Sequence, residues 1–188
     1  FNRMGYDIET VDVAFAGIFA GLMANKWDMC VSGIYVTKAR EAEMDFTDPY
    51  QEGFDAIVVL AKGDLKKPGD LKGKKVAAEA GTASAAFLAG LEGDNGPFET
   101  LGYDDKETMF LDLENGRVQA LATGFIDFVK KNKQDPNMFR VLVTSQDNYM
   151  IAGAVRTGDK IRDIFNEGLN SMKKDGTLAK LYEQFLGV

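Results

Sequence analysis

Arg40 and Thr37 form the pattern in this sequence that most clearly suits ligand binding. Thr37 is a good helix N-cap, because its hydroxyl can accept a hydrogen bond from a backbone N–H of the first turn. Arg40, three residues later, would lie on that first turn, where its guanidinium could hold a carboxylate with two parallel hydrogen bonds. The alternative is a surface ion pair between Arg40 and one of the neighbouring acids Glu41, Glu43 and Asp45.

The turn Gly81-Thr82-Ala83-Ser84 is a second candidate site. It follows an apolar strand pattern and opens a helical one. Free N–H groups at the start of a helix attract an anion. We therefore expect Thr82, Ala83 and Ser84 to contact the same carboxylate as Arg40, although a Gly-Thr turn before a helix is common.

Glu79 ends the strand before that turn. There its carboxylate could meet a basic group of a ligand. The alternative is a structural ion pair with Lys74 or Lys75.

Composition excludes several kinds of chemistry. The 188 residues contain no histidine and one cysteine, so a Ser-His-Asp triad, a Cys-His pair, a multi-thiolate metal site and an intrachain disulfide are all excluded. Cys30 lies in an apolar run and reads as a buried thiol. The net charge of −7 argues against a nucleic-acid binder, which needs a basic surface. We expect no cofactor and no metal.

The order of hydrophobic patterns predicts an α/β fold, because short apolar strands alternate with helical segments. A nearly continuous apolar run is expected to be a strand covered on both faces, at residues 54–61. The other predicted strands are 10–13, 28–33, 75–79, 118–123, 140–144 and 149–155. Helices are predicted at 17–25, after Thr37, from Ala83, at 105–115, 125–132, 160–174 and 177–186.

Two junctions are too short for this pattern. Residues 5–9 resemble a turn that opens a helix, yet the strand predicted at Thr10 begins at once. Thr123-Gly124-Phe125 leaves almost no room between a strand and the next helix. Either the chain is trimmed or segments are missing at these places, and we favour missing segments because a parallel crossover needs about a dozen residues.

Taken in order, many stretches of the chain resemble the extracytoplasmic solute-binding proteins of ABC importers, of the polar amino-acid class (family 3). Any one stretch is a weak signal, but the ordered set covers nearly the whole chain. The stretches are Gly5–Glu9, Phe15–Leu22, Trp27–Gly33, Thr37–Arg40, Asp45–Tyr50, Leu71–Val76, Gly81–Thr82, Asn115–Ala120, Leu169–Thr177 and Leu181–Tyr182.

The resemblance implies a periplasmic-binding-protein type II fold. Two lobes, each a mainly parallel sheet flanked by helices, would be joined by two hinge strands and would close on a ligand. Residues 1–51 and 149–188 would form the first lobe and residues 52–148 the second. The implied function is capture of a small carboxylate-bearing solute, most often an amino acid, for an ABC permease. The resemblance also implies a monomer. It would lie outside the cytoplasm, in the periplasm or the extracellular space, either with or without a lipid anchor.

The resemblance also assigns roles to residues of the first lobe. Gly33 and Tyr35 correspond to a segment that offers a backbone carbonyl and a hydroxyl to the ligand's ammonium. Tyr35 departs from the usual serine or threonine, so its ring either enters the pocket or packs at the cleft edge. Phe15 corresponds to an aromatic residue that lines the ligand's side chain, with core packing beside Val11, Val13 and Ile18 as its alternative.

Thr123 and Gly124 mark the main departure from the family. Similar proteins carry an aspartate directly after this strand, where it pairs with the ligand's ammonium, and Gly124 stands there instead. An ammonium buried without a counter-charge is costly. Either residues that include this aspartate are missing near Thr123, which we favour, or the ligand has no ordinary α-amino group.

Two other functions share the fold. Some proteins of this architecture are dehydratases of cyclic carboxylates, and Glu79 would be the general acid here. Others are sensing domains of receptors, for which a following membrane span would be diagnostic. Fold alone does not decide among them.

Overall fold

The computed structural model describes residues 1–186 of the chain. These residues divide into two compact units, which are described separately below. Unit 1 comprises Phe1–Val13, Gly17–Gly53 and Tyr149 onward, and unit 2 comprises Ala14–Ala16 and Phe54–Asn148. Apart from the short excursion at Ala14–Ala16, the chain passes between the units at residues 53/54 and 148/149, beside the paired strands β2 (Gln51–Gly53) and β8 (Tyr149–Ile151).

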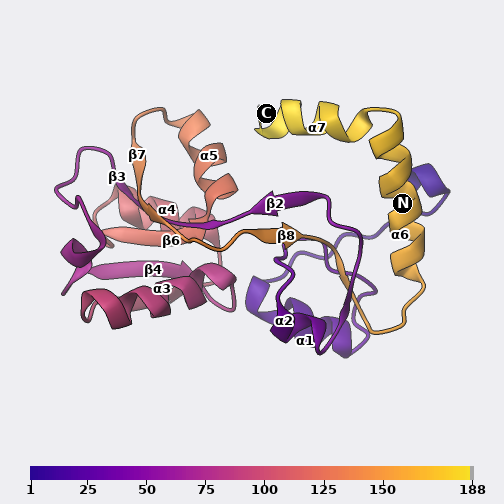
Figure 1. Ribbon diagram of the computed structural model, residues 1–188, viewed down its shortest axis with the longest axis horizontal. Coiled ribbons are helices and arrows are strands. Elements are labelled where there is room, and N and C mark those ends of the chain that lie inside the picture. The colour runs from indigo at the N-terminus through magenta and orange to yellow at the C-terminus, as the bar shows by residue number, and fades with distance from the viewer. Residues whose placement is uncertain (187–188) are drawn as a thin grey trace. The chain divides into compact units, whose positions relative to one another are not determined.

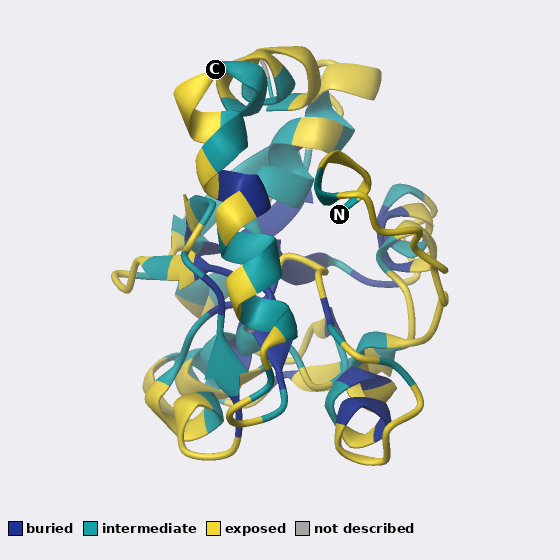
Figure 2. Cartoon of the chain, turned by 90° about the vertical axis from the view of Figure 1, so that its right-hand side faces the viewer, coloured by how far each residue is buried: buried dark blue, intermediate teal, exposed yellow. Residues whose placement is uncertain are grey.

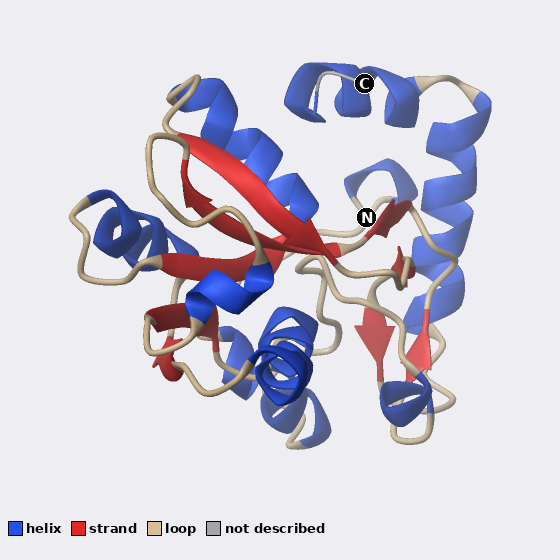
Figure 3. Ribbon diagram, turned by 60° about the vertical axis from the view of Figure 1, so that its left-hand side comes forward, coloured by secondary structure: helices blue, strands red, loops and turns tan. Residues whose placement is uncertain are grey.

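Unit 2 is built on a five-stranded sheet with the order β5-β4-β6-β3-β7 (Figures 1 and 3). Strands β4 and β5 are parallel, as are β4 and β6, whereas β3 is antiparallel to both of its neighbours, β6 and β7. Four strands thus run one way and β3 runs the other. The strands are β3 (Asp55–Leu60), β4 (Lys75–Glu79), β5 (Glu99–Tyr103), β6 (Ala120–Gly124) and β7 (Phe139–Thr144).

Helices cover both faces of this sheet. Alternate residues of β3 divide between two hydrophobic clusters, because successive side chains of a strand point to opposite faces. Ile57 and Val59 pack with Leu88 of α3 (Ala83–Asn95), whereas Ala56 and Val58 pack with the opposite helices. Those helices are α4 (Lys106–Glu114) and α5 (Phe125–Gln134), and η3 (Pro68–Leu71) closes the α3 side. The buried strand predicted at 54–61 is therefore confirmed.

Unit 1 contains only antiparallel strand pairs among its described residues, so the parallel sheet expected in this part of the chain is not formed there. Strand β1 (Asp45–Phe46) pairs with β9 (Ala154–Val155), and β2 pairs with β8. The predicted strand 149–155 is thus divided in two. The helices are η1 (Asn2–Met4), η2 (Phe15–Gly17), α1 (Ile18–Met23), α2 (Lys38–Glu41), α6 (Ile161–Lys174) and α7 (Thr177–Leu186).

Two predicted strands of unit 1 are wrong. Residues 10–13 form no strand, and every residue from 5 to 14 is exposed (Figure 2). Alternation of apolar residues produces a strand only where a neighbouring strand accepts its hydrogen bonds, and no pairing partner is present for these residues in the described chain. Residues 28–33 contribute a single bridge, from Cys30 to Ala154.

Candidate functional site

Arg40 is held at the start of α2 in unit 1. Thr37 caps this helix as predicted, since its hydroxyl accepts a hydrogen bond from the Arg40 N–H at 3.3 Å. The side chain turns back along the preceding loop, where Nη1 donates to the Tyr35 carbonyl oxygen at 2.8 Å. Cζ also lies 4.9 Å from the centre of the Phe19 ring, within cation–π range. These two contacts fix the direction of the guanidinium.

One of the acids expected to pair with Arg40 binds another arginine instead. Asp45, one of the expected partners, is bound by Arg162 Nη1 at 3.1 Å and accepts a hydrogen bond from the Gly158 N–H. The cation–π contact with Phe19 was not predicted from the sequence. The sequence feature that could have indicated it is an aromatic residue in the short helix α1, upstream of the loop that leads to Arg40.

Tyr35 packs inside unit 1. Its ring stacks on Tyr149 with centroids 4.8 Å apart and is only 8% exposed. A Cβ on Gly53 would come within 3.2 Å of the Tyr35 ring, so these residues fit closely beside β2. Of the two roles considered for Tyr35, packing is the one seen within this unit. Gly33 has φ +62°, a conformation that favours glycine, and is exposed.

In unit 2, the turn before α3 forms the predicted helix start. The Thr82 hydroxyl accepts from the Ala85 N–H at 3.2 Å and donates to the Glu79 carbonyl oxygen at 2.7 Å, so capping uses both of its hydrogen-bonding functions. Ala83 is the first residue of α3. Ser84 is buried, and its hydroxyl donates to Asp55 Oδ1 at 2.5 Å.

Glu79 and Thr123 lie in a cluster of charged groups at the same edge of the sheet. Lys106 Nζ is 2.8 Å from Asp127 Oδ2 and 3.7 Å from Glu79 Oε2. The Thr123 hydroxyl donates to Asp127 Oδ2 at 3.4 Å. Glu79 therefore pairs with Lys106. The sequence had suggested Lys74 or Lys75 as its structural partner instead.

Burial and the neighbouring charges together set the pKa values of Glu79 and Lys106. Burial raises the pKa of Glu79 above its ordinary value, and the charge of Lys106 offsets this only in part. Burial alone would lower the pKa of Lys106, but the charges of Asp127 and Glu79 outweigh it, so that the pKa is raised. Lys106 therefore stays protonated at neutral pH and neutralises one of the two carboxylates.

The junction at Gly124 needs no missing residues. Gly124 ends β6 and is itself the N-cap of α5, and the Phe125 N–H donates to the Phe54 carbonyl oxygen at 2.8 Å. The helix that follows supplies the crossover to β7. The direct join of strand and helix therefore accounts for the short spacing that suggested a gap near Thr123.

Phe15 opens η2 and belongs to the short stretch Ala14–Ala16 that groups with unit 2. Its expected neighbours Val11 and Val13 are 50% and 39% exposed, so they form no core around it. The predicted residues thus form two sets, each within one unit. Gly33, Tyr35 and Arg40 lie in unit 1, whereas Glu79, Thr82, Ala83, Ser84 and Thr123 lie at one edge of unit 2.

The sequence analysis missed Asp55, Lys106 and Asp127. Asp55 is the first residue of β3 and only 1% exposed. A carboxylate in an otherwise apolar buried strand is a signal that could have identified it. Lys106 and Asp127 give no comparable signal, because charged residues are ordinary in the first turn of a helix.

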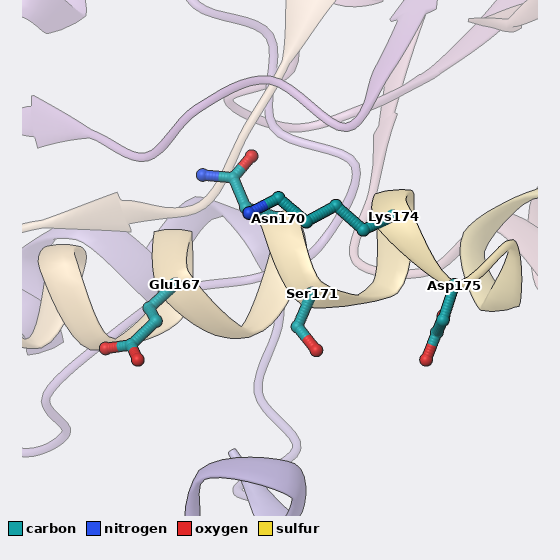
Figure 4. Close-up of a pocket in the computed structure, with 5 residues that line it drawn as sticks. All are labelled: Glu167, Asn170, Ser171, Lys174 and Asp175. Carbon is teal, nitrogen blue, oxygen red and sulfur yellow. The ribbon is translucent and has the colours of Figure 1, made fainter.

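Among residues 1–186, two hollows of unit 1 contain no predicted site residue. One, of about 590 Å³, lies along α6 (Figure 4). Glu167, Ser171 and Asp175 extend from one side of this helix, and Arg3 binds both Ser171 and Asp175. The other, of about 510 Å³, lies between residues 49–52, Met150 and α7.

Within residues 1–186, no three Cys, Asp or Glu side chains are grouped so that they could hold a metal ion. No helix in the same range is both long enough and apolar enough to cross a membrane.

Comparison with known proteins identifies the family. The family described as bacterial extracellular solute-binding proteins, family 3, matches residues 1–188. The chain belongs to this family. ABC transporter arginine-binding protein 1 of Escherichia coli (strain K12) is 30% identical over 92% of this chain and 71% of its own length. L-cystine-binding protein TcyJ of the same strain is 28% identical over 99% of this chain and 70% of its own length.

Solved structures agree with this assignment. An ancestral arginine-binding protein bound to arginine matches with a TM-score of 0.88 and 33% identity, over 98% of this chain and 82% of that one. An ancestral amino acid-binding protein described as a precursor of cyclohexadienyl dehydratase matches with a TM-score of 0.83 and 28% identity, over 98% and 80%. The predicted α/β fold of the periplasmic-binding-protein type is confirmed, whereas a mainly parallel sheet is formed only in unit 2 among the described residues. These relatives are named as binding proteins, and the dehydratase alternative gains no support from them.

Proposed function

We propose that this family 3 solute-binding protein captures an amino acid and delivers it to the membrane permease of an ABC importer. The observation that carries the proposal is the fixed guanidinium of Arg40, directed by the Tyr35 carbonyl and the Phe19 ring. A guanidinium held in one direction loses little freedom when a carboxylate binds it through two hydrogen bonds. The names of the relatives support an amino acid as the source of that carboxylate.

Capture would involve both units. Arg40 in unit 1 would hold the ligand's carboxylate, and the sheet edge of unit 2 with Glu79 and Thr123 would meet the rest of the ligand. Ligands of open α/β sheets bind outside the carboxyl ends of parallel strands, which is where this edge lies. Closure of one unit on the other about β2 and β8 would then exclude water.

Arginine is the first ligand to test. Two of the relatives named above are arginine-binding proteins. The cluster of Glu79, Asp127 and Lys106 holds two carboxylates for one ammonium, and this balance also suits a ligand with a positive charge. We further propose that the protein acts as a monomer outside the cytoplasm, with a permease as its partner and without a cofactor.

Thermal unfolding tests this function. The purified chain would be unfolded with each common L-amino acid, with L-cystine, and with the matching decarboxylated amines, agmatine for arginine. A ligand at about 100 times its Kd adds about 2.7 kcal/mol, a shift of several degrees in a chain of this length. The proposal predicts stabilisation by at least one amino acid and none by its amine. Equal stabilisation by acid and amine would contradict carboxylate capture.

A further inference from the structure

Asp55 lies directly opposite Gly124 in the sheet of unit 2. Strands β4 and β6 end at Glu79 and Gly124, whereas β3 runs the other way and begins at Asp55. Asp55 is therefore at the edge formed by the carboxyl ends of the parallel strands. Residues directly opposite in an antiparallel pair point their side chains to the same face. The side chain of Asp55 thus shares its face with position 124, where glycine provides no side chain.

That face is the one covered by α3. Ile57 and Val59 of β3 and Ala122 of β6 pack in the cluster that contains Leu88 of α3, and Asp55 is in phase with them. The hydrogen bond of 2.5 Å from the Ser84 hydroxyl to Asp55 Oδ1 agrees with this direction, because Ser84 lies in the first turn of α3.

The backbone holds this carboxylate in place. The Asp55 N–H donates to the Ser145 hydroxyl at 3.0 Å, and the Asp55 carbonyl oxygen accepts from the Ser145 N–H at 2.8 Å. With only 1% of the residue exposed, an ionised side chain has lost nearly all of its hydration. Such a loss is costly, and a cation that binds there recovers part of it.

The Asp55 carboxylate at the start of α3 determines whether this edge of the sheet attracts a ligand's carboxylate or its ammonium group. From the sequence, Thr82, Ala83 and Ser84 were expected to bind the ligand's carboxylate. The Asp55 carboxyl group already accepts the Ser84 hydroxyl, and an ionised Asp55 would repel a second carboxylate there. An ammonium would be attracted to the same place.

We propose that Asp55 binds the ligand's ammonium group and takes the place of a carboxylate at position 124. The inference rests on the proposed function, because it takes the ligand to be an amino acid. Asp55 would be the residue that makes the site select α-amino acids over acids without an amino group.

The test compares Asp55→Asn with the wild-type chain by isothermal titration calorimetry. Asparagine keeps the shape and can still accept the Ser84 hydrogen bond, but it carries no charge. The probes are L-arginine and 5-guanidinopentanoate, which lacks only the amino group; if another amino acid stabilises the chain most, it and its desamino acid are used. We expect Asp55→Asn to weaken binding of the amino acid by about 10- to 100-fold. Binding of the desamino acid should stay within about threefold.

A double variant moves the charge across the strand pair. Gly124 has φ −61° and ψ 139°, which any residue adopts, so the backbone at this position accepts the aspartate of the double variant Asp55→Asn with Gly124→Asp. It should recover at least about tenfold of the lost affinity. Asp94→Asn, at an exposed position near the far end of α3, is the matched control and should bind as the wild type does.

The outcomes separate the two proposals. The role of Asp55 would be overturned, and the proposed function left intact, by either of two results. Asp55→Asn could bind the amino acid as tightly as the wild type does, or it could lose affinity for the amino acid and the desamino acid equally. A wild-type chain that binds no amino acid would overturn the proposed function as well. If Asp55→Asn does not fold, Ser84→Ala replaces it, since it removes the hydroxyl that orients the carboxylate. Ser84→Ala should weaken the amino acid several-fold and spare the desamino acid, and equal loss of both would contradict the inference.

Discussion

The guanidinium carbon of Arg40 lies 4.9 Å from the centre of the Phe19 ring, while its Nη1 donates to the Tyr35 carbonyl at 2.8 Å. The ring comes from α1 and the carbonyl from the loop before α2, so two separate segments of unit 1 orient one side chain. An arginine oriented in this way is suited to bind a planar carboxylate. The first two predictions test this arrangement.

Arg40→Lys should weaken amino-acid binding by about 10- to 100-fold, because lysine keeps the charge but lacks the planar fork that makes two parallel hydrogen bonds. Calorimetric titration measures the change. Arg117→Lys is the matched control, since the Arg117 side chain is 70% exposed and should not affect binding. Affinity in Arg40→Lys equal to that of the wild type would show that Arg40 does not bind the ligand.

Phe19→Leu should weaken binding by about 2- to 10-fold, since a cation–π contact contributes about 0.5–1 kcal/mol at exposed sites and more when desolvated. Phe19→Tyr retains an aromatic face and should bind as the wild type does. The ratio of the two affinities is the measurement. If leucine and tyrosine at this position bind the ligand equally well, the ring does not orient Arg40.

Gly21→Ala should destabilise unit 1. A Cβ at this position would overlap the ring of Trp27, whose Nε1 donates to the Ile18 carbonyl oxygen at 3.0 Å. Overpacking of this kind costs about 1–3 kcal/mol. Because Trp27 is the only tryptophan of the chain, its fluorescence should also shift to the red as the ring moves toward solvent.

Gly90→Ala is the control for that experiment. Gly90 lies inside α3, and a Cβ there would meet no atom within 4 Å. Alanine should stabilise the helix by about 0.5–1 kcal/mol and leave the Trp27 emission unchanged. A Gly21→Ala protein as stable as the wild type would show that the two residues are not in close contact.

Glu79→Gln should change how stability depends on pH. Burial raises the pKa of Glu79 in the folded chain above its ordinary value of 4.5. A carboxyl with a raised folded-state pKa favours folding fully only below the unfolded value, and this contribution is lost as pH rises through the folded value. The wild type should therefore lose Tm relative to Glu79→Gln as pH rises from 4 through neutrality.

Glu107→Gln is the control for the pH series, because the Glu107 side chain is 81% exposed. The difference in Tm between Glu107→Gln and the wild type should not change in this way as pH rises from 4 through neutrality. A difference between wild type and Glu79→Gln that is flat with pH, or that changes in the opposite direction, would contradict the burial of Glu79.

Local sequence rules predicted the parts of the fold that depend on near neighbours. Thr37 was recognised as an N-cap because a cap bonds to a backbone N–H three residues away, and the turn at Gly81-Thr82 correctly indicated a helix start at Ala83. The apolar run from 54 to 61 indicated a strand covered on both faces, and β3 is that strand. The N-cap bonds to a residue only a few positions away, and the strand is indicated by the apolar composition of its own residues.

Features that depend on distant partners could not be predicted in this way. β5 was missed because Gly102 interrupts its pattern and only its pairing with β4 makes it a strand. The significance of Asp55 depends on its register with Gly124, which no local pattern specifies. Tyr35 likewise packs on Tyr149, a residue more than a hundred positions later.

The most direct test of the central claim is calorimetric titration of the wild-type chain and Arg40→Lys with the amino acid that stabilises the chain most. The account predicts saturable binding of one molecule per wild-type chain and a loss of about 10- to 100-fold in affinity in Arg40→Lys. Absence of saturable binding to the wild type by any amino acid of the panel would contradict it.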